Sequence, residues 1–426
     1  MKKLIFTFFT LATFQMNAAI LVVKEYGVNA TYSTIATALS AAANNDTIVV
    51  YDKPSGQLWT ENLTIDKNIT FLHPTQGTRF KVPGSITIVP KAGMDLYIIG
   101  WDLNNNSIGV SASGATATSS NRAKITVADC NNMNNLDLNI DWVDARIFYN
   151  QTNFLGSLYF RHGMAIANIV NIGIQTIQES TTAAQNDSIL IIGNKARWCF
   201  FDSKECGLIA NNYFSNSNAT PSGNWHDPGN GNALSIRYHN QAANAFLSIV
   251  NNTIVNSGTS FGYGGVRMGM AITNCGTVAN IKILNNLVLA YGGATNYGIW
   301  FESYSGQPFI SHNYINTQTQ ANFSNLSFNN ELNYTSATLN AYGSIDTWGR
   351  ASSGNTNLIN KGNYLGEYYD IDLTRNDIGT YGGPYTIDNY LTSGTGKGKV
   401  LYVNIKHQLT NLNEILNIKG SAGAKF

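Results

Sequence analysis

The chain has 426 residues, and its 26 Lys and Arg against 25 Asp and Glu give a formal net charge of +1. This near-neutral charge argues against a nucleic-acid-binding protein, which needs an excess of basic residues to neutralise phosphates. The 22 Tyr, 19 Phe and 7 Trp argue against intrinsic disorder. Only 12% of the residues are charged, about half the roughly 25% usual for soluble domains. A polar surface made mostly of amides and hydroxyls suits strands and tight turns better than exposed helices.

The first residues have the composition of a secretory signal peptide. Residues 1–3 give a positive start, residues 4–14 form an apolar core, and Asn17-Ala18-Ala19 offers small residues for cleavage. The apolar core is too short to span a bilayer, and no later stretch reaches the length of a transmembrane helix. We therefore expect residues 1–19 to be removed and the mature protein to be secreted or held at a bacterial cell surface. A buried N-terminal strand is the alternative for this segment.

One short helix is predicted near the start of the mature chain. Residues 33–43 (STIATALSAAA) place apolar residues at i, i+3, i+4 and i+7 from Ile35, with Ser33 as the N-cap. From there to about residue 390 the sequence shows short apolar strands separated by Asn, Gly and Ser. The clearest predicted strands are residues 20–23, 47–51, 63–65, 69–72, 86–89, 96–99, 189–192, 247–250, 281–284 and 309–311.

Several of these strands end in the same kind of turn, a polar pair that ends in Asn, with an apolar or aromatic residue one or two positions later. The pairs are Asn211-Asn212, Asn251-Asn252, Asn285-Asn286 and His312-Asn313, and the second residue advances by 40, 34 and 27. A solenoid with loops of variable length gives such a drift, and its stacked Asn side chains can hydrogen-bond to one another. Asn suits the bend because it tolerates the left-handed backbone conformation. The pattern predicts a single-stranded right-handed parallel β-helix, which is an all-β fold with a short N-terminal capping helix.

Two segments resemble known proteins of this architecture. Residues 30–72, with a helix, an Asn45-Asp46 turn, TIVV and TENLTIDKNITFL, resemble the N-terminal cap of pectate-lyase-like β-helix proteins. Residues 359–384 resemble the segment that ends the solenoid in many secreted bacterial β-helix proteins, with its D-x-D…R-x-D-I-G-x-Y-G run. The resemblance implies a β-helix over residues 20–390. It does not identify a reaction, because these folds carry lyases, hydrolases, adhesins and inert surface proteins.

Residues 391–426 form a separate tail. Residues 399–405 alternate like a strand, and residues 412–418 add further apolar positions. We expect the tail to cap the last coil, where an open solenoid end exposes backbone and core. A sorting signal is the alternative.

Polar and aromatic residues are predicted to gather on one outer face of the solenoid. With Ile236, Val266 and Ile299 pointing inward, the alternation of a strand sends their neighbours outward. If the strands stack in one sheet, that face is a candidate binding site, with two further residues from a flanking loop. The predicted binding residues are Tyr159, Arg161, Arg237, His239, Arg267, Trp300 and Glu302 on the face, and Trp225 and His226 in the loop.

Such a face suits a polysaccharide as partner. Guanidinium groups pair with carboxylate or sulfate, and aromatic rings present an apolar platform to sugar C–H groups. We therefore expect a monomeric secreted protein that binds an extracellular, anionic polysaccharide and cleaves it if it is an enzyme. A non-enzymatic adhesin or structural spacer is the alternative, in which these residues are ordinary solvated side chains.

The catalytic candidates are Arg161, Arg237, His239 and Glu302. Arg161-His162-Gly163 resembles the R-H-G element of chondroitinase-B-like and alginate lyases, although Lys124 is the nearest lysine upstream. A glycoside hydrolase needs two carboxyl groups roughly 5–10 Å apart. The sequence offers Asp202, Glu205, Asp227 and Glu302. A polysaccharide lyase, a glycoside hydrolase and a non-enzyme all stay open.

No cofactor is expected, except that Asp370, Asp372 and Asp377 carry oxygen ligands suited to Ca²⁺. Alternatively, Arg375 pairs with Asp372 or Asp377 and locks the final turn. The four cysteines show no metal-binding spacing and are expected as buried small hydrophobes, with one disulfide as the alternative. These cysteines are Cys130, Cys199, Cys206 and Cys275.

Overall fold

The structure is a computed structural model. It describes residues 18–27, 31–75, 79–178, 188–216, 232–238, 246–257, 266–273, 275, 280–290, 295–302, 308–316, 319–321, 331–333, 345–350, 355–391, 398–405 and 418–424. The predicted signal peptide falls almost entirely outside these residues, so its removal stays a prediction, as does the division of the chain at residues 19 and 390.

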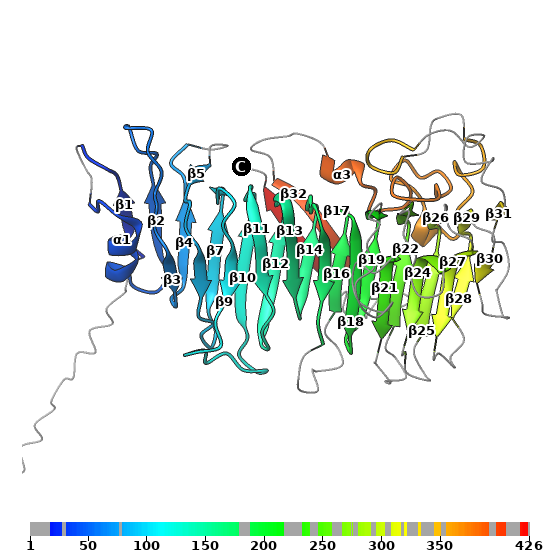
Figure 1. Cartoon of the computed structure of the whole chain (residues 1–426), viewed down its shortest axis with the longest axis horizontal. Coiled ribbons are helices and arrows are strands. Elements are labelled where there is room, and N and C mark those ends of the chain that lie inside the picture. Colours follow the sequence, from blue (N-terminus) through cyan, green and yellow to red (C-terminus); the bar gives the residue numbers. More distant parts are fainter. Residues whose placement is uncertain are drawn as a thin grey trace, which may run out of the picture.

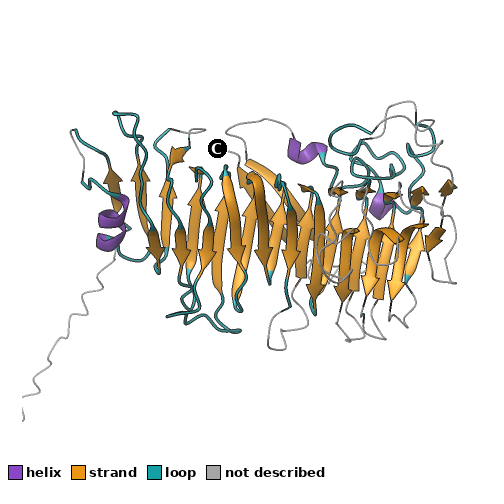
Figure 2. Cartoon of the chain, in the orientation of Figure 1, coloured by secondary structure: helices purple, strands orange, loops and turns teal. Residues whose placement is uncertain are grey.

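Parallel strands wind into three long sheets, and the predicted parallel β-helix is confirmed (Figures 1 and 2). The 12-stranded sheet contains β1 (Ile20–Val23), β2 (Asp46–Val50), β4 (Ile69–Leu72), β7 (Asp95–Ile99), β10 (Ala123–Ala128), β12 (Val143–Phe148), β14 (Gly163–Ile166), β16 (Ser188–Ile192), β19 (Cys206–Ala210), β22 (Phe246–Val250), β25 (Asn280–Leu284) and β28 (Phe309–Ser311). The 11-stranded sheet contains β3 (Leu63–Ile65), β6 (Ile86–Ile88), β9 (Ile108–Val110), β11 (Met133–Leu138), β13 (Thr152–Phe160), β15 (Gly173–Thr176), β18 (Trp198–Ser203), β21 (Asn232–Tyr238), β24 (Val266–Thr273), β27 (Thr295–Glu302) and β30 (Thr319–Ala321).

A 6-stranded sheet forms the third face of the later coils. It contains β17 (Lys195–Ala196), β20 (Tyr213–Asn216), β23 (Thr253–Asn256), β26 (Leu287–Ala290), β29 (Tyr314–Asn316) and β31 (Glu331–Asn333). The remaining elements are the short parallel pair β5 (Phe80–Lys81) and β8 (Trp101–Asp102), the antiparallel pair β32 (Gly398–Ile405) and β33 (Ile418–Ala424), and the helices α1 (Ile35–Ala41), η2 (Gly366–Tyr368) and α3 (Asp388–Leu391).

All ten of the clearest predicted strands are present, with both ends within one residue of the expected positions. Their alternation is that of a strand with one buried face: in β4, Ile69 and Phe71 point into the core, whereas Thr70 and Leu72 are only partly buried. The core is therefore built from the inward residues of successive coils, which lie above one another along the solenoid.

The capping helix α1 covers the first coils (Figure 1). Its N-cap is Thr34, whose hydroxyl accepts a hydrogen bond from the backbone of Thr37 at 3.1 Å, so the predicted N-cap at Ser33 is wrong by one residue. Two more first-turn amides donate to the carboxylate of Glu61, at 2.7 and 3.0 Å. At the other end, the ammonium of Lys67 donates to three C-terminal carbonyls. Both helix ends are thus satisfied by side chains that flank β3.

A ladder of asparagines follows the strands of the 12-stranded sheet in seven successive coils. Each side-chain nitrogen donates to the side-chain oxygen of the next asparagine at 2.9–3.1 Å, and all seven residues are at most 1% exposed. The ladder consists of Asn150, Asn168, Asn194, Asn212, Asn252, Asn286 and Asn313. The hydrogen-bonded stack predicted from the amide pairs is therefore confirmed, and it extends three coils further toward the N-terminus than those pairs indicated.

The residue before each ladder asparagine has a positive φ of 54–64°. We call these residues the corner column. They are Tyr149, Ala167, Gly193, Asn211, Asn251, Asn285 and His312. The left-handed conformation that the sequence assigned to Asn is thus confirmed in the first member of each predicted pair, while the second member builds the ladder.

Residues 355–391, the closing segment, fold back along the outside of the corner column. The side chain of Asn211 donates to the carbonyl of Thr380 at 3.0 Å, that of Asn251 donates to Asn376 at 2.7 Å, and that of Asn285 accepts from the amide of Asn363 at 2.7 Å. The segment follows the last described strand of the solenoid, β31, along the chain. It is a strap over several coils, because the outward amides of the column supply its hydrogen-bond partners.

The tail contains the predicted strand. Residues 399–405 lie in β32, as predicted, and β32 pairs with β33 in an antiparallel hairpin. Its role as a cap on the last coil stays a prediction, as does that of residues 412–418, most of which lie outside the described residues.

The four cysteines are buried thiols, so the disulfide alternative is not formed. None of the described helices is long and apolar enough to cross a membrane.

The ladder makes the amide of Asn252 a sensitive position. Replacement by Asp removes the donor that serves Asn286 and the carbonyls of Ile209 and Val250, and it buries a carboxylate. We expect Asn252→Asp to lower the free energy of unfolding by about 3 kcal/mol or more in guanidinium chloride at pH 7. The exposed Asn104→Asp is the control, and an equal loss in both variants would contradict a structural role for the ladder.

Candidate functional site

Six of the predicted binding residues lie in or beside one sheet, and Arg267 of β24 is one of them. Tyr159 is in β13, Arg161 directly follows it, Arg237 is in β21, and Trp300 and Glu302 are in β27, all in the 11-stranded sheet. Tyr159, Arg161, Arg237, Trp300 and Glu302 are each partly buried. Their placement on the outer face is consistent with the alternation, because Ile236 and Ile299 are fully buried in the core.

The register aligns some of these residues and separates others. Arg237 pairs with Thr273, and Thr273 pairs with Glu302, so Arg237 and Glu302 share one row across the sheet. Asp202 of β18 belongs to the same row, beside Arg237. Trp300 lies in a second row, level with Ala271.

Arg267 is on the same sheet but not level with Arg237. Its backbone pairs with Asn296, and it precedes Thr273 by six residues in β24, which is roughly 20 Å along the strand. The expected alignment of Arg237, Arg267 and Trp300 at equivalent positions is therefore wrong. Apolar residues alternate along all of β24, so the pattern fixes which side chains point inward but not the register. The side chain of Arg267 lies outside the described residues.

Arg161 is held by side chains from the preceding coil. Its guanidinium donates to Asn139 at 2.8 Å and to Asp141 at 2.7 Å, and it approaches the carbonyl of Gln178 at 3.4 Å. A guanidinium fixed in this way is a poor base, because it keeps its proton and its donors are occupied. The geometry therefore favours an anchoring or ligand-binding role for Arg161 over proton abstraction.

Arg237 and Trp300 also have neighbours on the outer face. The guanidinium of Arg237 lies 4.0 Å from the carboxylate of Asp202 and 5.1 Å from the ring centre of Phe200. The rings of Trp300 and Tyr297 are 4.7 Å apart in an edge-to-face arrangement. The face thus combines paired charges with aromatic rings, and its described arginines already face carboxylates.

The middle of the Trp300 row is closed to solvent. Phe200, Ser235 and Ala271 are 4%, 6% and 1% exposed, although they lie on the outer side of their strands. In the other row Asp202, Arg237 and Glu302 are partly buried, whereas Thr273, between Arg237 and Glu302, is 4% exposed. An extended ligand on this sheet would therefore contact these three charged residues and Trp300 rather than the closed middle of either row.

His162 and Glu205 form a buried pair. His162 Nδ1 lies 2.7 Å from a carboxylate oxygen of Glu205, and the two residues are 8% and 3% exposed. Burial alone would lower the pKa of His162, but the hydrogen bond to Glu205 and its charge raise the pKa above the usual value. This pair connects two coils and is closed to a substrate. In this chain the R-H-G element is thus part of the structural frame.

The carboxyl candidates for glycoside hydrolysis do not form a close pair on the described face. Asp202 and Glu302 are three strands apart, so their Cα atoms are roughly 14 Å from each other, beyond the 5–10 Å that such chemistry uses. Glu205 is buried against His162. Asp227 lies outside the described residues, together with the predicted binding residues His239, Trp225 and His226.

The three aspartates proposed for Ca²⁺ are used in separate turns of the closing segment. Asp370 accepts from the amides of Gly383 and Asp377, Asp372 accepts from Thr374, and Asp377 accepts from the amide of Asn360. Among the described residues no group of three His, Cys, Asp or Glu is placed to hold a metal ion.

Arg375 stabilises the closing segment in a different way from the one expected. Its Nε donates to the carbonyl of Gly362 at 2.7 Å, and its Nη2 donates to the carbonyl of Lys361 at 3.3 Å. The predicted pairing with Asp372 or Asp377 is therefore replaced by hydrogen bonds to backbone oxygens. Arg375 thus has the expected structural role. Its partners could not be predicted, because every residue has a backbone carbonyl.

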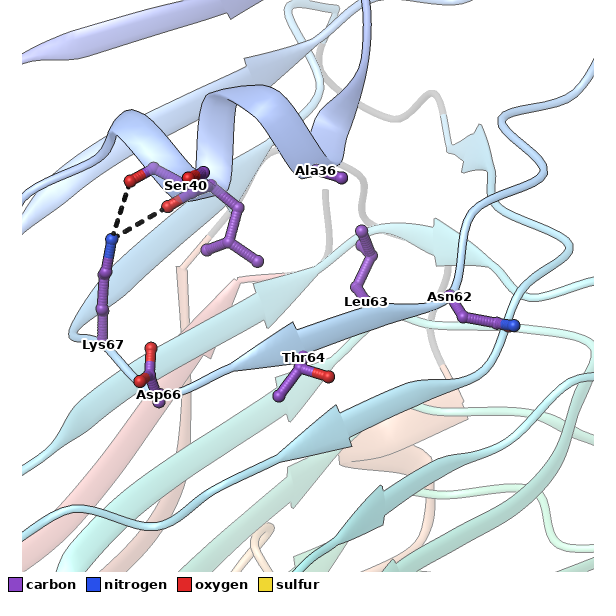
Figure 3. A pocket seen from close by; sticks show the side chains of 8 residues that line it. Ala36, Ser40, Asn62, Leu63, Thr64, Asp66 and Lys67 are labelled. Atoms are coloured by element: carbon purple, nitrogen blue, oxygen red, sulfur yellow. Dashed lines mark hydrogen bonds between the residues drawn. The ribbon is translucent and has the colours of Figure 1, made fainter. Parts of the chain in front are cut away.

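A hollow of about 300 Å³ lies between α1 and β3 (Figure 3). Its charged lining residues are Lys67 and Asp66, beside the polar Ser40, Asn62 and Thr64. The ammonium of Lys67 is directed at the helix, where it donates to the carbonyls of Leu39 and Ser40 (Figure 3). The hollow is thus a by-product of capping the helix and has no free cation for an anionic ligand.

A second cavity, of about 140 Å³, lies beside the corner column. It is lined by Tyr149, Trp348 and Tyr390, none of which the sequence analysis singled out. One signal in the sequence could have indicated this cavity. The residue before the ladder asparagine is Tyr149, Ala167 or Gly193 in the first three coils, and it becomes Asn only from Asn211 onward.

No protein family, curated protein or solved structure matches this chain. The function is therefore inferred from its residues and their arrangement.

The partly buried carboxyl of Asp370 predicts a pH dependence of stability. Burial raises its pKa to about 6, whereas an unfolded Asp titrates near 3.9. Between about pH 4 and 6 the folded state therefore binds more protons than the unfolded state, so stability falls as the pH rises through this window. We expect the melting temperature to fall between pH 4.5 and 6.5, and Asp370→Asn to remove part of that fall.

Asp372→Asn is the matched control. Hydrogen bonds from Thr374 lower the pKa of Asp372, so its titration lies below this window and the variant should keep the wild-type pH dependence. If Asp370→Asn also kept it, the carboxyl would not be protonated in the folded state.

Proposed function

We propose that the chain binds an extracellular polysaccharide along the outer face of the 11-stranded sheet. The observation that carries the proposal is the placement of Arg237 and Glu302 in one row, with Tyr159 and Trp300 on the same sheet. From β13 to β27 this sheet advances by five strands, roughly 24 Å, which is long enough to contact several sugar residues. The signal-peptide pattern supports an extracellular partner.

The residue types suit sugar recognition. Guanidinium and carboxylate groups can hydrogen-bond to hydroxyls in fixed directions, and the rings of Trp300 and Tyr297 offer an apolar surface with a polar edge. Residues spread along a rigid sheet would recognise an extended chain better than a compact ligand.

The charge balance favours a polysaccharide with little negative charge over the anionic one expected from the sequence. Arg161 is paired with Asp141 and Arg237 faces Asp202, and Glu302 adds a further carboxylate. An anionic chain would have to compete with these carboxylates for the guanidinium groups.

A non-enzymatic surface or spacer protein is the second candidate. It is favoured by the way Arg161 and the His162–Glu205 pair connect neighbouring coils. In this interpretation the charged residues hold the solenoid rigid, and the outer face has no ligand.

Affinity electrophoresis through gels that contain a single polysaccharide tests the proposal. We expect retardation by at least one neutral polysaccharide of a panel of xylan, mixed-linkage β-glucan and galactomannan, and weaker retardation by alginate and pectate. Trp300→Ala should weaken binding about tenfold, because it removes an aromatic platform.

Tyr26→Ala is the matched control, since Tyr26 is an exposed aromatic residue outside the 11-stranded sheet. Equal retardation of the two variants would contradict a binding role for Trp300, and no retardation of the wild type by any polysaccharide would favour the spacer. The absorbance of unsaturated uronates during incubation with alginate and pectate separates a lyase from a binding protein.

A further inference from the structure

The corner column changes character along the solenoid. At Asn211, Asn251 and Asn285 its side chains hydrogen-bond to the closing segment. At Ala167 and Gly193 there is no side chain that could make such bonds. The closing segment nevertheless continues over this part of the column, because Tyr390 reaches Gly193. A cavity of about 140 Å³ is left between column and strap.

The small residue that keeps the cavity open, Ala167, suits its backbone conformation less well than Asn would. Ala167 has a φ of 62°, a conformation that Asn adopts more readily than Ala. Asn occupies the corresponding position in three later coils. The chain thus has Ala at position 167, although Asn would suit the backbone better, and the larger side chain of Asn would fill the hollow.

The walls of the cavity are aromatic and closely fitted. A Cβ atom at Gly193 would lie 2.1 Å from the ring of Tyr390, so only glycine admits that ring. Trp348 forms another wall, and the ammonium of Lys195 lies 4.9 Å from its ring centre. Arg79, at the rim, is bound to the carboxylate and the carbonyl of Asp129. Arg79 is the one charged residue among the described residues that line the cavity, and its charge is balanced by Asp129.

The lining also contains polar groups. The hydroxyl of Tyr149 is buried and has no hydrogen-bond partner in the described structure. Burial raises the pKa of Tyr149 to about 12, so the hydroxyl stays protonated at neutral pH and can donate. The amide of Gln151 is exposed at the same cavity. A buried hydroxyl without a partner carries a free-energy penalty that a bound ligand can relieve.

We propose that this cavity binds a single neutral sugar ring. Aromatic walls suit the C–H faces of a pyranose, while the Tyr149 hydroxyl and the Gln151 amide suit its hydroxyls. The volume is below the 300–1,000 Å³ or so typical of drug-sized ligands, and the pairing of Arg79 with Asp129 disfavours a carboxylate or phosphate. The site lies at the corner between the 12- and 6-stranded sheets, so it is independent of the polysaccharide face proposed above.

Saturation-transfer NMR with the methyl glycosides of glucose, galactose, mannose and N-acetylglucosamine tests this site. The wild type should transfer saturation to the ring protons of at least one glycoside. Tyr149→Phe, which removes one oxygen atom, should weaken that binding several-fold. Ala167→Asn should abolish it without lowering the melting temperature, because Asn fills the hollow and suits the left-handed backbone.

Leu373→Asn is the matched control, since Leu373 has a φ of 66° and is exposed outside the cavity. It should bind as the wild type does, whereas the loss of binding in Tyr149→Phe separates this site from the polysaccharide face. The proposal is overturned if no glycoside receives saturation from the wild type, or if Tyr149→Phe binds as tightly as the wild type does. Should Ala167→Asn fail to fold, Tyr149→Phe decides the outcome.

Discussion

The hydrogen bond from each ladder asparagine to the next is the interaction on which the register of the coils depends. These amides are buried, and a buried amide without its partners costs about 1–3 kcal/mol. Each side chain must therefore meet an oxygen at the same height in the neighbouring coil, as Asn212 meets Asn252 at 2.9 Å. Because an amide both donates and accepts, the ladder can continue through seven coils. Loops elsewhere in a coil can change length while this corner stays aligned.

The corner also determines what can lie outside the solenoid. A left-handed residue precedes every ladder asparagine, and at Asn211, Asn251 and Asn285 its side chain hydrogen-bonds to the closing segment. Where that residue is Asn251, it binds the strap through Asn376, and where it is Gly193, it admits the ring of Tyr390. One backbone constraint thus produces both the attachment of the closing segment and the cavity beside it. The 11-stranded sheet is farther from the ladder along each coil, and its outer face is free to vary.

The strands and the ladder could be predicted because they depend on local patterns, namely alternating apolar residues and repeated amide pairs. Asn168 and Asn194 were missed because Ala167 and Gly193 precede them in place of a second amide. The row of Arg237 could not be predicted, since Met268, Met270 and Ile272 permit several registers with the same faces inward. The partners of Arg161 and Arg237 were also hidden. Asp141 and Asp202 come from other coils, at separations that no motif marks.

A double-mutant cycle on Asn212 and Asn252 tests the central role of the ladder most directly. The free energies of unfolding of the two single alanine variants and of the double variant give the coupling between adjacent coils. The ladder predicts a coupling of about 1 kcal/mol for this pair, and additive effects for Asn150 and Asn313, which lie at its two ends. Additivity within about 0.5 kcal/mol for Asn212 and Asn252 would contradict the account.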